Sequence, residues 1–400
     1  MENPSSIPNG QDRLFSTPFL LLCLSHALFA ASFNMMIPEL PSYLSSLGGA
    51  EYKGLIIALF TLTAGISRPF SGKLTDKVGR LFVMYVGTAA CVLCGLLYPV
   101  LTTVGGFLLL RFLHGFSTGF KPTGTSAYVA DTVPPGRLGE AMGVLGICLS
   151  IGASASPLLG SWLTQTYGIQ VMFYASVVPA VLSMLILYRL PETLHQREPF
   201  RFSLLRIKKT DMLDPGAFPA GIVMICAYAS YGVILTLVPD LSDAVGVGNR
   251  GVFFALFTLA SITTRFTAGK VSDRLGRVPV LKVSTVLIAA SMILFAHTDR
   301  PWMLYLASVI FGFGNGIFSP AINAWTIDLG DPAHKGRALA TMFIALEIAI
   351  GGGAALGGWY FARHHDGMPA VFYGAAAMSL LGLLYLLLRR PSALRPLKTV

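Results

Sequence analysis

Hydrophobic residues run along this chain in long segments that are separated by short polar stretches, from one end to the other. A helix that crosses a membrane needs about 20 consecutive, mostly apolar residues, and each segment is about that long. The pattern therefore predicts an all-α membrane protein with twelve transmembrane helices in two sets of six. We expect the spans near 18–46, 51–72, 81–102, 105–131, 139–164 and 169–189, then near 214–243, 250–271, 278–298, 301–329, 336–362 and 369–389.

The most polar internal stretch separates the two sets of six spans. It predicts a cytoplasmic linker, with a short amphipathic helix near 202–207. The polar start has no basic segment before the first apolar run, which predicts that this run is retained as a span. We therefore predict a cytoplasmic N-terminus (1–17), a first six-helix bundle (18–189), the linker (190–213), a second six-helix bundle (214–389) and a cytoplasmic C-terminus (390–400).

The distribution of basic residues predicts the orientation. Most lysines and arginines fall in the termini, the linker and alternate connections, whereas the opposite connections hold Lys53, Arg250, Arg300 and Arg363. Basic residues stay preferentially in the cytoplasm, so both termini are predicted to be cytoplasmic. An even number of spans requires the same result, and we expect a bacterial inner membrane.

The composition agrees with a membrane protein and excludes several other classes. Hydrophobic residues make up 54% of the chain and charged residues only 12%, about half the charge of soluble domains. The net charge of +10 does not predict nucleic-acid binding, because the basic residues lie between apolar segments. The five cysteines lie within apolar segments and predict no metal or redox site. No phosphate-binding loop of the type GxxxxGK[ST] is present, and we expect neither an enzyme nor a cofactor.

A nine-residue motif occurs twice. GKLTDKVGR begins at Gly72 and GKVSDRLGR begins at Gly269. Further pairs match when the halves are aligned, among them Asp131 with Asp328 and Gly160 with Gly357. Parallel repeats of this kind build two similar bundles that are related by an axis along the membrane normal. The repeat therefore predicts a pseudo-symmetric pair of bundles.

The pattern Gly-x-x-x-Asp-(Arg/Lys)-x-Gly-Arg between the second and third spans resembles the signature of the major facilitator superfamily. The resemblance covers nearly the whole chain and is greatest to twelve-span drug–proton antiporters and sugar-efflux exporters. It implies a monomer that moves a small solute by alternating access, with the proton gradient as its driving force. It also implies that the lipid bilayer surrounds the helices.

The resemblance also implies that the repeated motif is a conformational latch. Asp76 is expected to meet the partner bundle near the start of the eleventh span, Arg80 to join Asp131, and Asp273 with Arg277 to act symmetrically. The alternative is that basic loops only fix the topology. The predicted latch residues are Gly72, Asp76, Gly79, Arg80, Asp131, Arg137, Glu140, Gly269, Asp273, Gly276 and Arg277.

The fifth span bears on the direction of transport. Antiporters of the family carry a glycine-rich fifth helix that ends in Gly-Pro-x-x-Gly-Gly, and this chain reads GVLGICLSIGASASPLLGSW. Gly146, Gly152, Pro157 and Gly160 keep the pattern, whereas serine replaces two of the usual glycines. The partial match favours an antiporter that exports a solute. The alternatives are a proton-coupled symporter that imports an organic anion or a sugar, and, third, a channel or a signalling protein.

Ionisable residues at membrane depth are costly and point to function. Glu347 lies in the middle of the eleventh span, and Glu39 and Asp240 are repeat partners at the outer ends of the first and seventh. Arg111 and His114 match the family's fourth-span motif, which implies proton coupling. We predict a role in proton coupling for all five. In the alternative interpretation, Glu347 is permanently paired with Lys121 or Arg68, and Glu39 and Asp240 are merely interfacial carboxylates. Arg111 is then structural, and His114 is a hydrogen-bonded packing residue.

Lys121 lies well inside the fourth span, next to Pro122, and is expected to face a water-filled cavity. With Arg111 it would make the cavity partly positive and favour a solute with a carboxylate, a phosphate or a metal-chelating group, unless an internal carboxylate neutralises it. The pattern does not identify the solute. The other predicted cavity residues are His26, Asn34, Asn315, Asn323 and Trp325.

Overall fold

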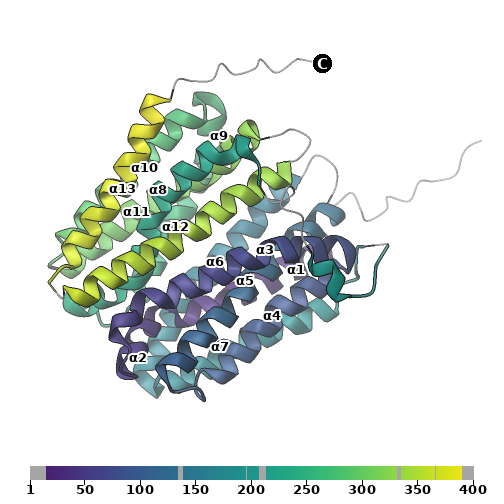
Figure 1. Cartoon of the computed structure of the whole chain (residues 1–400), viewed down its shortest axis with the longest axis horizontal. Helices are drawn as coiled ribbons and strands as arrows, with labels where there is room; N and C mark the ends of the chain where they lie inside the picture. The colour runs from purple at the N-terminus through teal and green to yellow at the C-terminus, as the bar shows by residue number, and fades with distance from the viewer. Residues whose placement is uncertain are drawn as a thin grey trace, which may run out of the picture.

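The computed structural model describes residues 15–133, 138–194, 196–206, 213–330, 335–364 and 366–389. The side chains of residues 138–140, 266–267, 269–270, 273 and 335–337 also lie outside the description. All regular secondary structure in the described part is helical, as predicted. The helices lie roughly parallel in two groups, one built from the first half of the chain and one from the second (Figure 1).

The first half contains seven described α-helices and two short 3-10 helices. They are α1 (Thr17–Met36), η2 (Ile37–Glu39), α2 (Leu40–Ser46), η3 (Ala50–Tyr52), α3 (Lys53–Lys77), α4 (Arg80–Leu97), α5 (Val104–Thr132), α6 (Leu138–Tyr167) and α7 (Ile169–Tyr188). The remainder of the described chain contains η4 (Phe202–Leu205), η6 (Pro215–Ala217), α8 (Phe218–Ala244), α9 (Val252–Leu275), α10 (Arg277–Ala296), α11 (Pro301–Leu329), α12 (Lys335–Arg363) and α13 (Met368–Leu388).

Ten helical segments of the described chain are long and apolar enough to cross a membrane. They are Thr17–Ser46, Ala50–Lys77, Arg80–Leu97, Ala141–Tyr167, Ile169–Tyr188, Pro215–Ala244, Arg277–Ala296, Pro301–Leu329, Ala338–Arg363 and Met368–Leu388. α9 adds a shorter apolar segment, Val252–Arg265, and α5 carries Arg111, His114 and Lys121, which make it more polar. The chain is a multi-pass membrane protein, and the count of twelve spans stays a prediction.

Two predicted elements differ from the structure. The first span is not one helix but is divided into α1, η2 and α2, because Pro38 and Pro41 lack the N–H that a continuous helix requires. The repeated motif is mainly helical and not a loop, since Gly72 lies within α3 and Gly269 within α9. The turns are made by the later glycines, Gly79 with φ 150° and Gly276 with φ 87°, where a side chain would be strained.

The helices pair in the same way in each half of the chain. In the first half, α1 packs on α6, α3 on α5, and α4 on α5 and α7. In the second half, α8 packs on α12, α9 on α11, and α10 on α11 and α13. The two halves meet mainly where α3 lies against α12 and α6 against α9. These two contacts form the seam between the halves.

Glycines of α6 allow the helix to approach α1 closely. A Cβ atom at Gly152 would lie 2.1 Å from the carbonyl oxygen of Ala27, and one at Gly160 would lie 2.0 Å from that of Met35. At Gly146, by contrast, a Cβ would meet nothing within 4 Å. Pro157 of the same helix contacts Gly251 of the second half. Two of the three predicted glycines therefore hold α6 against α1, and the proline lies at the seam.

Replacement of Gly160 by alanine should destabilise the protein, because the new methyl group would force α6 away from the backbone of α1. Overpacking of this kind costs about 1–3 kcal/mol. Gly146→Ala is the matched control on the same helix, and we expect it to be neutral or stabilising, since alanine favours a helix over glycine. Thermal unfolding of the purified variants in detergent measures both. Equal effects of the two substitutions would contradict the assigned packing.

Candidate transport site

The two ends of the helix bundle are distinguished by the chain itself. α1 begins and α13 ends at one end, which we name the proximal end, and α2 lies at the other, which we name the distal end (Figure 1). The connection between α3 and α4 and the start of α12 are proximal, whereas the connection between α8 and α9 is distal. The ionisable residues at membrane depth divide into a distal group, a seam pair and groups inside the first half.

Two ion pairs join the halves at the distal end. Lys53 at the start of α3 donates to Asp240 of α8, with 2.6 Å between Nζ and Oδ2. Arg250, between α8 and α9, donates to Glu39 of η2, with 2.8 Å between Nη1 and Oε2. Asn249 also donates to the carbonyl of Leu158 at 3.2 Å. The distal ends of the two halves are therefore held together by charge.

Glu39 is the most deeply buried carboxylate of this group, at 3% exposure. Its second oxygen, Oε1, accepts a hydrogen bond from Ser161 of α6 at 2.7 Å. Arg250 also contacts Asp243 through Nε at 2.8 Å and Nη2 at 2.6 Å. The hydrogen bonds that Arg250 donates to Asp243, together with the charge of Glu39, raise the pKa of Arg250 above its ordinary value. The guanidinium therefore stays charged and bridges two carboxylates.

The seam between α3 and α12 contains a third ion pair. Arg68 of α3 donates to Glu347 of α12, with 2.6 Å between Nη2 and Oε1. The guanidinium also lies over the ring of Phe343, 5.1 Å from its centroid. Glu347 borders a largely apolar pocket of about 940 Å³ between the two helices. Of the pairings considered from the sequence, Glu347 makes the one with Arg68.

Arg111 and His114 form a buried group inside the first half. Arg111 donates from Nε to the carbonyl of Ile56 at 3.0 Å and from Nη1 to Tyr98 Oη at 3.3 Å. Tyr98 Oη lies 3.3 Å from Nδ1 of His114. The Arg111 guanidinium also lies 4.5 Å from the centre of the Phe60 ring. Neutral groups thus surround this cation, and its predicted role in proton coupling stays a prediction.

Lys121 does not face a water-filled cavity in this structure, contrary to the prediction. It is fully buried, and its ammonium group donates to Ser25 of α1 at 2.9 Å and to Ser183 of α7. It also lies 5.2 Å from the centre of the Phe29 ring. Two hydroxyls and an aromatic face surround this amine, and its contacts join α5 to α1 and α7.

The other predicted cavity residues are dispersed over both halves. His26 is buried and stacked on Phe29, with 6.3 Å between ring centroids, and Asn34 donates to the carbonyl of Ala30 in its own helix. Asn315 accepts from Tyr228 at 3.2 Å. Asn323 has a buried oxygen without a partner in the described structure, and Trp325 is buried beneath Arg389. His26 and Lys121 thus share a contact with Phe29, and the predicted cavity role of these residues stays a prediction.

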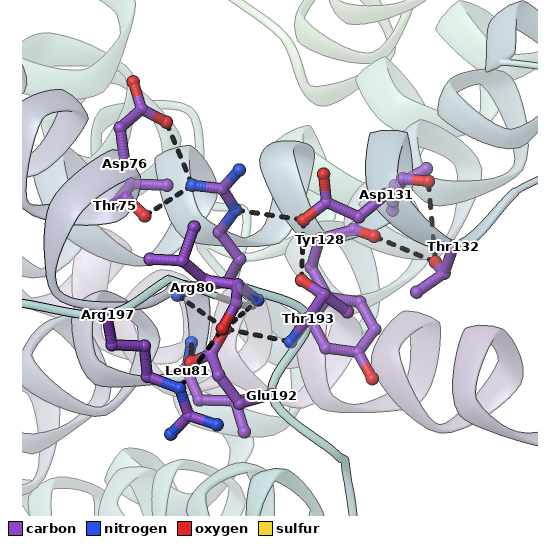
Figure 2. A network of polar contacts seen from close by, with 12 residues as sticks. Thr75, Asp76, Arg80, Leu81, Tyr128, Asp131, Thr132, Glu192, Thr193 and Arg197 are labelled. Carbon is purple, nitrogen blue, oxygen red and sulfur yellow. Dashed lines mark hydrogen bonds and ion pairs between the residues drawn. The ribbon is translucent and has the colours of Figure 1, made fainter.

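Several residues of the predicted latch at the proximal end form a polar network within the first half (Figure 2). Arg80 donates to Asp131 at 3.0 Å, as expected, and also to Asp76 at 2.9 Å. The Asp76 side chain is 73% exposed. Its predicted contact with the start of the eleventh span concerns residues 331–337, whose side chains lie outside the description, so that contact stays a prediction.

The linker supplies a residue of this network that the sequence analysis missed. Glu192 accepts hydrogen bonds from the backbone N–H groups of Arg80 and Leu81, each at 3.0 Å. Its carboxylate thus caps the start of α4, where the helix dipole favours negative charge. Thr193 donates to Asp131 at 2.6 Å (Figure 2). The linker is therefore fastened to the repeated motif by a cap at α4 and a hydrogen bond to α5.

The second copy of the motif is built in the same way where it is described. Arg277 donates to Asp328 at 3.1 Å and to Ser272 at 3.1 Å, as Arg80 does to Asp131. Arg137 lies outside the described part of the chain, and so do the side chains of Asp273 and Glu140. Gly269 is described only as a residue of α9. Their predicted latch roles stay predictions.

Several functional candidates were missed because their partners come from distant segments. Lys53 and Arg250 were noted only as rare basic residues of the outer connections, and Ser161 only as a departure from the glycine pattern. Asp243 gave no signal of its own. The one signal in the sequence was that only four basic residues were assigned to the outer connections. Two of these, Lys53 and Arg250, bind carboxylates of the other half.

Removal of the cap at α4 should loosen the linker. We expect Glu192→Ala to cost about 1 kcal/mol, as is typical for loss of a capping side chain, and to speed tryptic cleavage of the linker at Arg197. Glu198→Gln is the control, because Glu198 forms an exposed pair with Lys77 and exposed pairs contribute little. Thermal unfolding and timed proteolysis measure both. An unchanged cleavage rate in Glu192→Ala would argue against the cap.

Comparisons with known proteins agree with this architecture. The profile of the Major Facilitator Superfamily matches residues 22–217 and 220–399. The chain is 28% identical over 387 residues to multidrug resistance protein MdtG of Enterobacter lignolyticus, covering 92% of this chain and 91% of the relative. It is 26% identical over 402 residues to the MdtG protein of Salmonella typhi, covering 96% of each.

Solved structures show the same fold at low identity. The human organic anion transporter MFSD10 (TETRAN) has a TM-score of 0.70 and 19% identity, with 92% of this chain and 98% of that chain covered. The peptide transporter POT in complex with sulfate has a TM-score of 0.79 and 15% identity, covering 94% and 95%. Because the family profile matches both halves and nearly the whole chain, this protein belongs to the major facilitator superfamily.

Proposed function

We propose that this transporter exports a small organic solute in exchange for protons, by alternating access between its two halves. The observation that carries the proposal is the set of ion pairs between the two halves, namely Lys53–Asp240 and Glu39–Arg250 at the distal end and Arg68–Glu347 at the seam. In the described part of the chain, these are the ion pairs that join the halves. Charges that bind across a moving interface connect the movement of the halves to a proton. The multidrug resistance proteins among the relatives support a solute of the drug class.

The proposed architecture is twelve spans in two bundles related by pseudo-symmetry. It is supported by the helix pairs, which correspond in the two halves, and by the repeated turn after α3 and after α9. The pairs Arg80–Asp131 and Arg277–Asp328 occupy corresponding places. Such repeats allow one bundle to rock against the other about a site near mid-membrane.

We propose that the distal end is the outer face and that the structure corresponds to a state closed there. The positive-inside rule supports this orientation, with both termini in the cytoplasm of a bacterium and the protein in the inner membrane as a monomer. The two distal ion pairs hold the outer ends of the halves together. At the proximal end, the described latch contacts stay within one half. Opening of the distal pairs would then expose the solute to the outside.

Glu347 is the leading candidate for the carried proton. Its carboxylate lies at the seam, 11% exposed, and its partner Arg68 belongs to the other half. Protonation of Glu347 would remove its charge, release Arg68 and weaken the contact between the halves. Binding of one proton would thereby be coupled to one movement of the halves. Arg111, His114 and Asp240 remain further candidates. The partial antiporter pattern of α6 and the multidrug resistance proteins among the relatives support export over import of an organic anion or a sugar.

Transport assays in inverted vesicles test the direction. With the cytoplasmic face outside and the interior acidified, we expect uptake of a lipophilic drug from a test panel that depends on the pH gradient and collapses when the gradient is dissipated. Release of a preloaded organic anion or sugar, driven by the same gradient, would instead indicate an importer. Gradient-independent flux of the panel would contradict proton coupling.

Replacement of Glu347 by glutamine should abolish uptake driven by the pH gradient, to the level of vesicles without the protein. Exchange of solute for solute should remain, since that reaction needs no proton. Asp366→Asn is the matched control, because Asp366 is an exposed carboxylate of a connection, and we expect it to transport normally. Proton-driven uptake that is unchanged in Glu347→Gln would remove this residue from the mechanism.

A further inference from the structure

The ion pair between Glu39 and Arg250 can break without leaving either charged group unpartnered, so the distal ends can separate. The two oxygens of Glu39 serve different halves, since Oε1 accepts from Ser161 of its own half and Oε2 accepts from Arg250 of the other. Arg250 likewise keeps two hydrogen bonds to Asp243 of its own half. If the link opens, each group retains a partner.

The neighbouring link lacks this property. Lys53 and Asp240 bind each other at 2.6 Å, and in the described structure neither has a second hydrogen-bond or ion-pair partner. Separation would therefore leave an ammonium group and a carboxylate to be solvated by water. The Lys53–Asp240 pair, which we name the clasp, therefore resists separation, whereas the shared partners make the Glu39 link readily reversible.

Glu39 can be reached from the distal surface. It borders a pocket of about 500 Å³, whose lining includes the polar residues Ser46, Gln165 and Arg250. The charged and titratable groups around it are few. α8 contributes Asp243, and also Asp240, which is occupied by Lys53. Arg250 comes from the connection after α8, and the hydroxyl of Tyr43 from α2. The α6 groups that face the pocket or Glu39 are neutral.

We propose that Glu39 is a proton-binding site that opens the outer gate, separate from the site of the carried proton. This inference rests on the proposed function. A proton from outside adds to Oε2, so the N–H···O bond from Arg250 is lost because a neutral acid no longer attracts the guanidinium. Ser161 keeps its bond to Oε1, and Arg250 stays with Asp243. No covalent bond other than O–H is formed.

The site regulates the gate and does not carry the proton across. The closed gate requires the ionised form of Glu39, so the proton leaves toward the outside before the halves rejoin. Because the proton binds the open form more tightly than the closed form, acid outside shifts the population toward the open form. Coupling between two such events commonly changes an equilibrium by about 5- to 150-fold.

Spin-label distances at the distal end test the proposal. Labels at Glu51→Cys and Asp299→Cys, both exposed and in different halves, report the separation of the outer ends in a background without the five native cysteines. In lipid nanodiscs, the ratio of long to short distances should rise by about 5- to 150-fold between pH 8 and pH 5. Glu39→Gln should give a high ratio at pH 8 that no longer changes with pH.

Two further variants separate the switch from the clasp. Asp240→Asn breaks the other link, so the ratio should be raised at every pH but keep its dependence on pH. Arg250→Gln tests the Glu39 link from the other half, and its ratio should be high and independent of pH. A pH response like that of the parent in Glu39→Gln or Arg250→Gln, or loss of the response in Asp240→Asn, would overturn the proposal.

The same variants in vesicles distinguish failure of the gate from failure of the proposed function. Glu39→Gln should slow solute uptake, because an outer gate that stays open returns less often to the inward-facing state, but the uptake that remains should keep the parent's number of protons per solute. Loss of that coupling would show that Glu39 carries the proton and would overturn the separate site. If the parent protein shows no gradient-driven uptake at all, the proposed exchange fails, while the distance measurements still decide the gate.

Discussion

A charge at membrane depth has to be paired or otherwise satisfied, because no water replaces a missing partner there. The rest of this structure depends on how that requirement is met. The carboxylates Glu39, Asp240 and Glu347 all lie where the two halves meet, and each takes its cation from the half to which it does not belong. The two halves are thus held by interactions that protonation or solvation can reverse.

The cations inside the first half are satisfied differently. Arg111 and Lys121 bind a carbonyl, hydroxyls and aromatic faces of neighbouring helices. Neutral partners of this kind do not dissociate when a proton is added. Together with the glycine contacts between α1 and α6, they favour a half that moves as a rigid unit. The pairs made by Glu39, Asp240 and Glu347 lie instead where the two halves meet, where a change of state is useful.

At the proximal end, the two halves are connected covalently by the linker, which is also held in place by polar contacts. The linker joins the halves through the chain, and Glu192 fixes its beginning to the start of α4 beside the Arg80 network (Figure 2). A movement of the second half can pull on the linker and reach the repeated motif through this cap. The distal end has no such connection in the linker, and it relies on the ion pairs and on close contacts such as Pro157 against Gly251.

The sequence by itself determined the properties that depend on local pattern. Apolar segments of membrane length, the repeated motif and the signature predicted the helical membrane fold and the family, and the family resemblance implied the pair Arg80–Asp131. The tertiary structure decided which distant residues meet. Lys121 lies beside two serines that are 96 and 62 residues away, and Glu39 meets Arg250 at a separation of 211 residues. Hydrophobic periodicity specifies that a helix forms but not which neighbour faces each side chain. Burial and pairing of charges therefore became known only when the helices were packed.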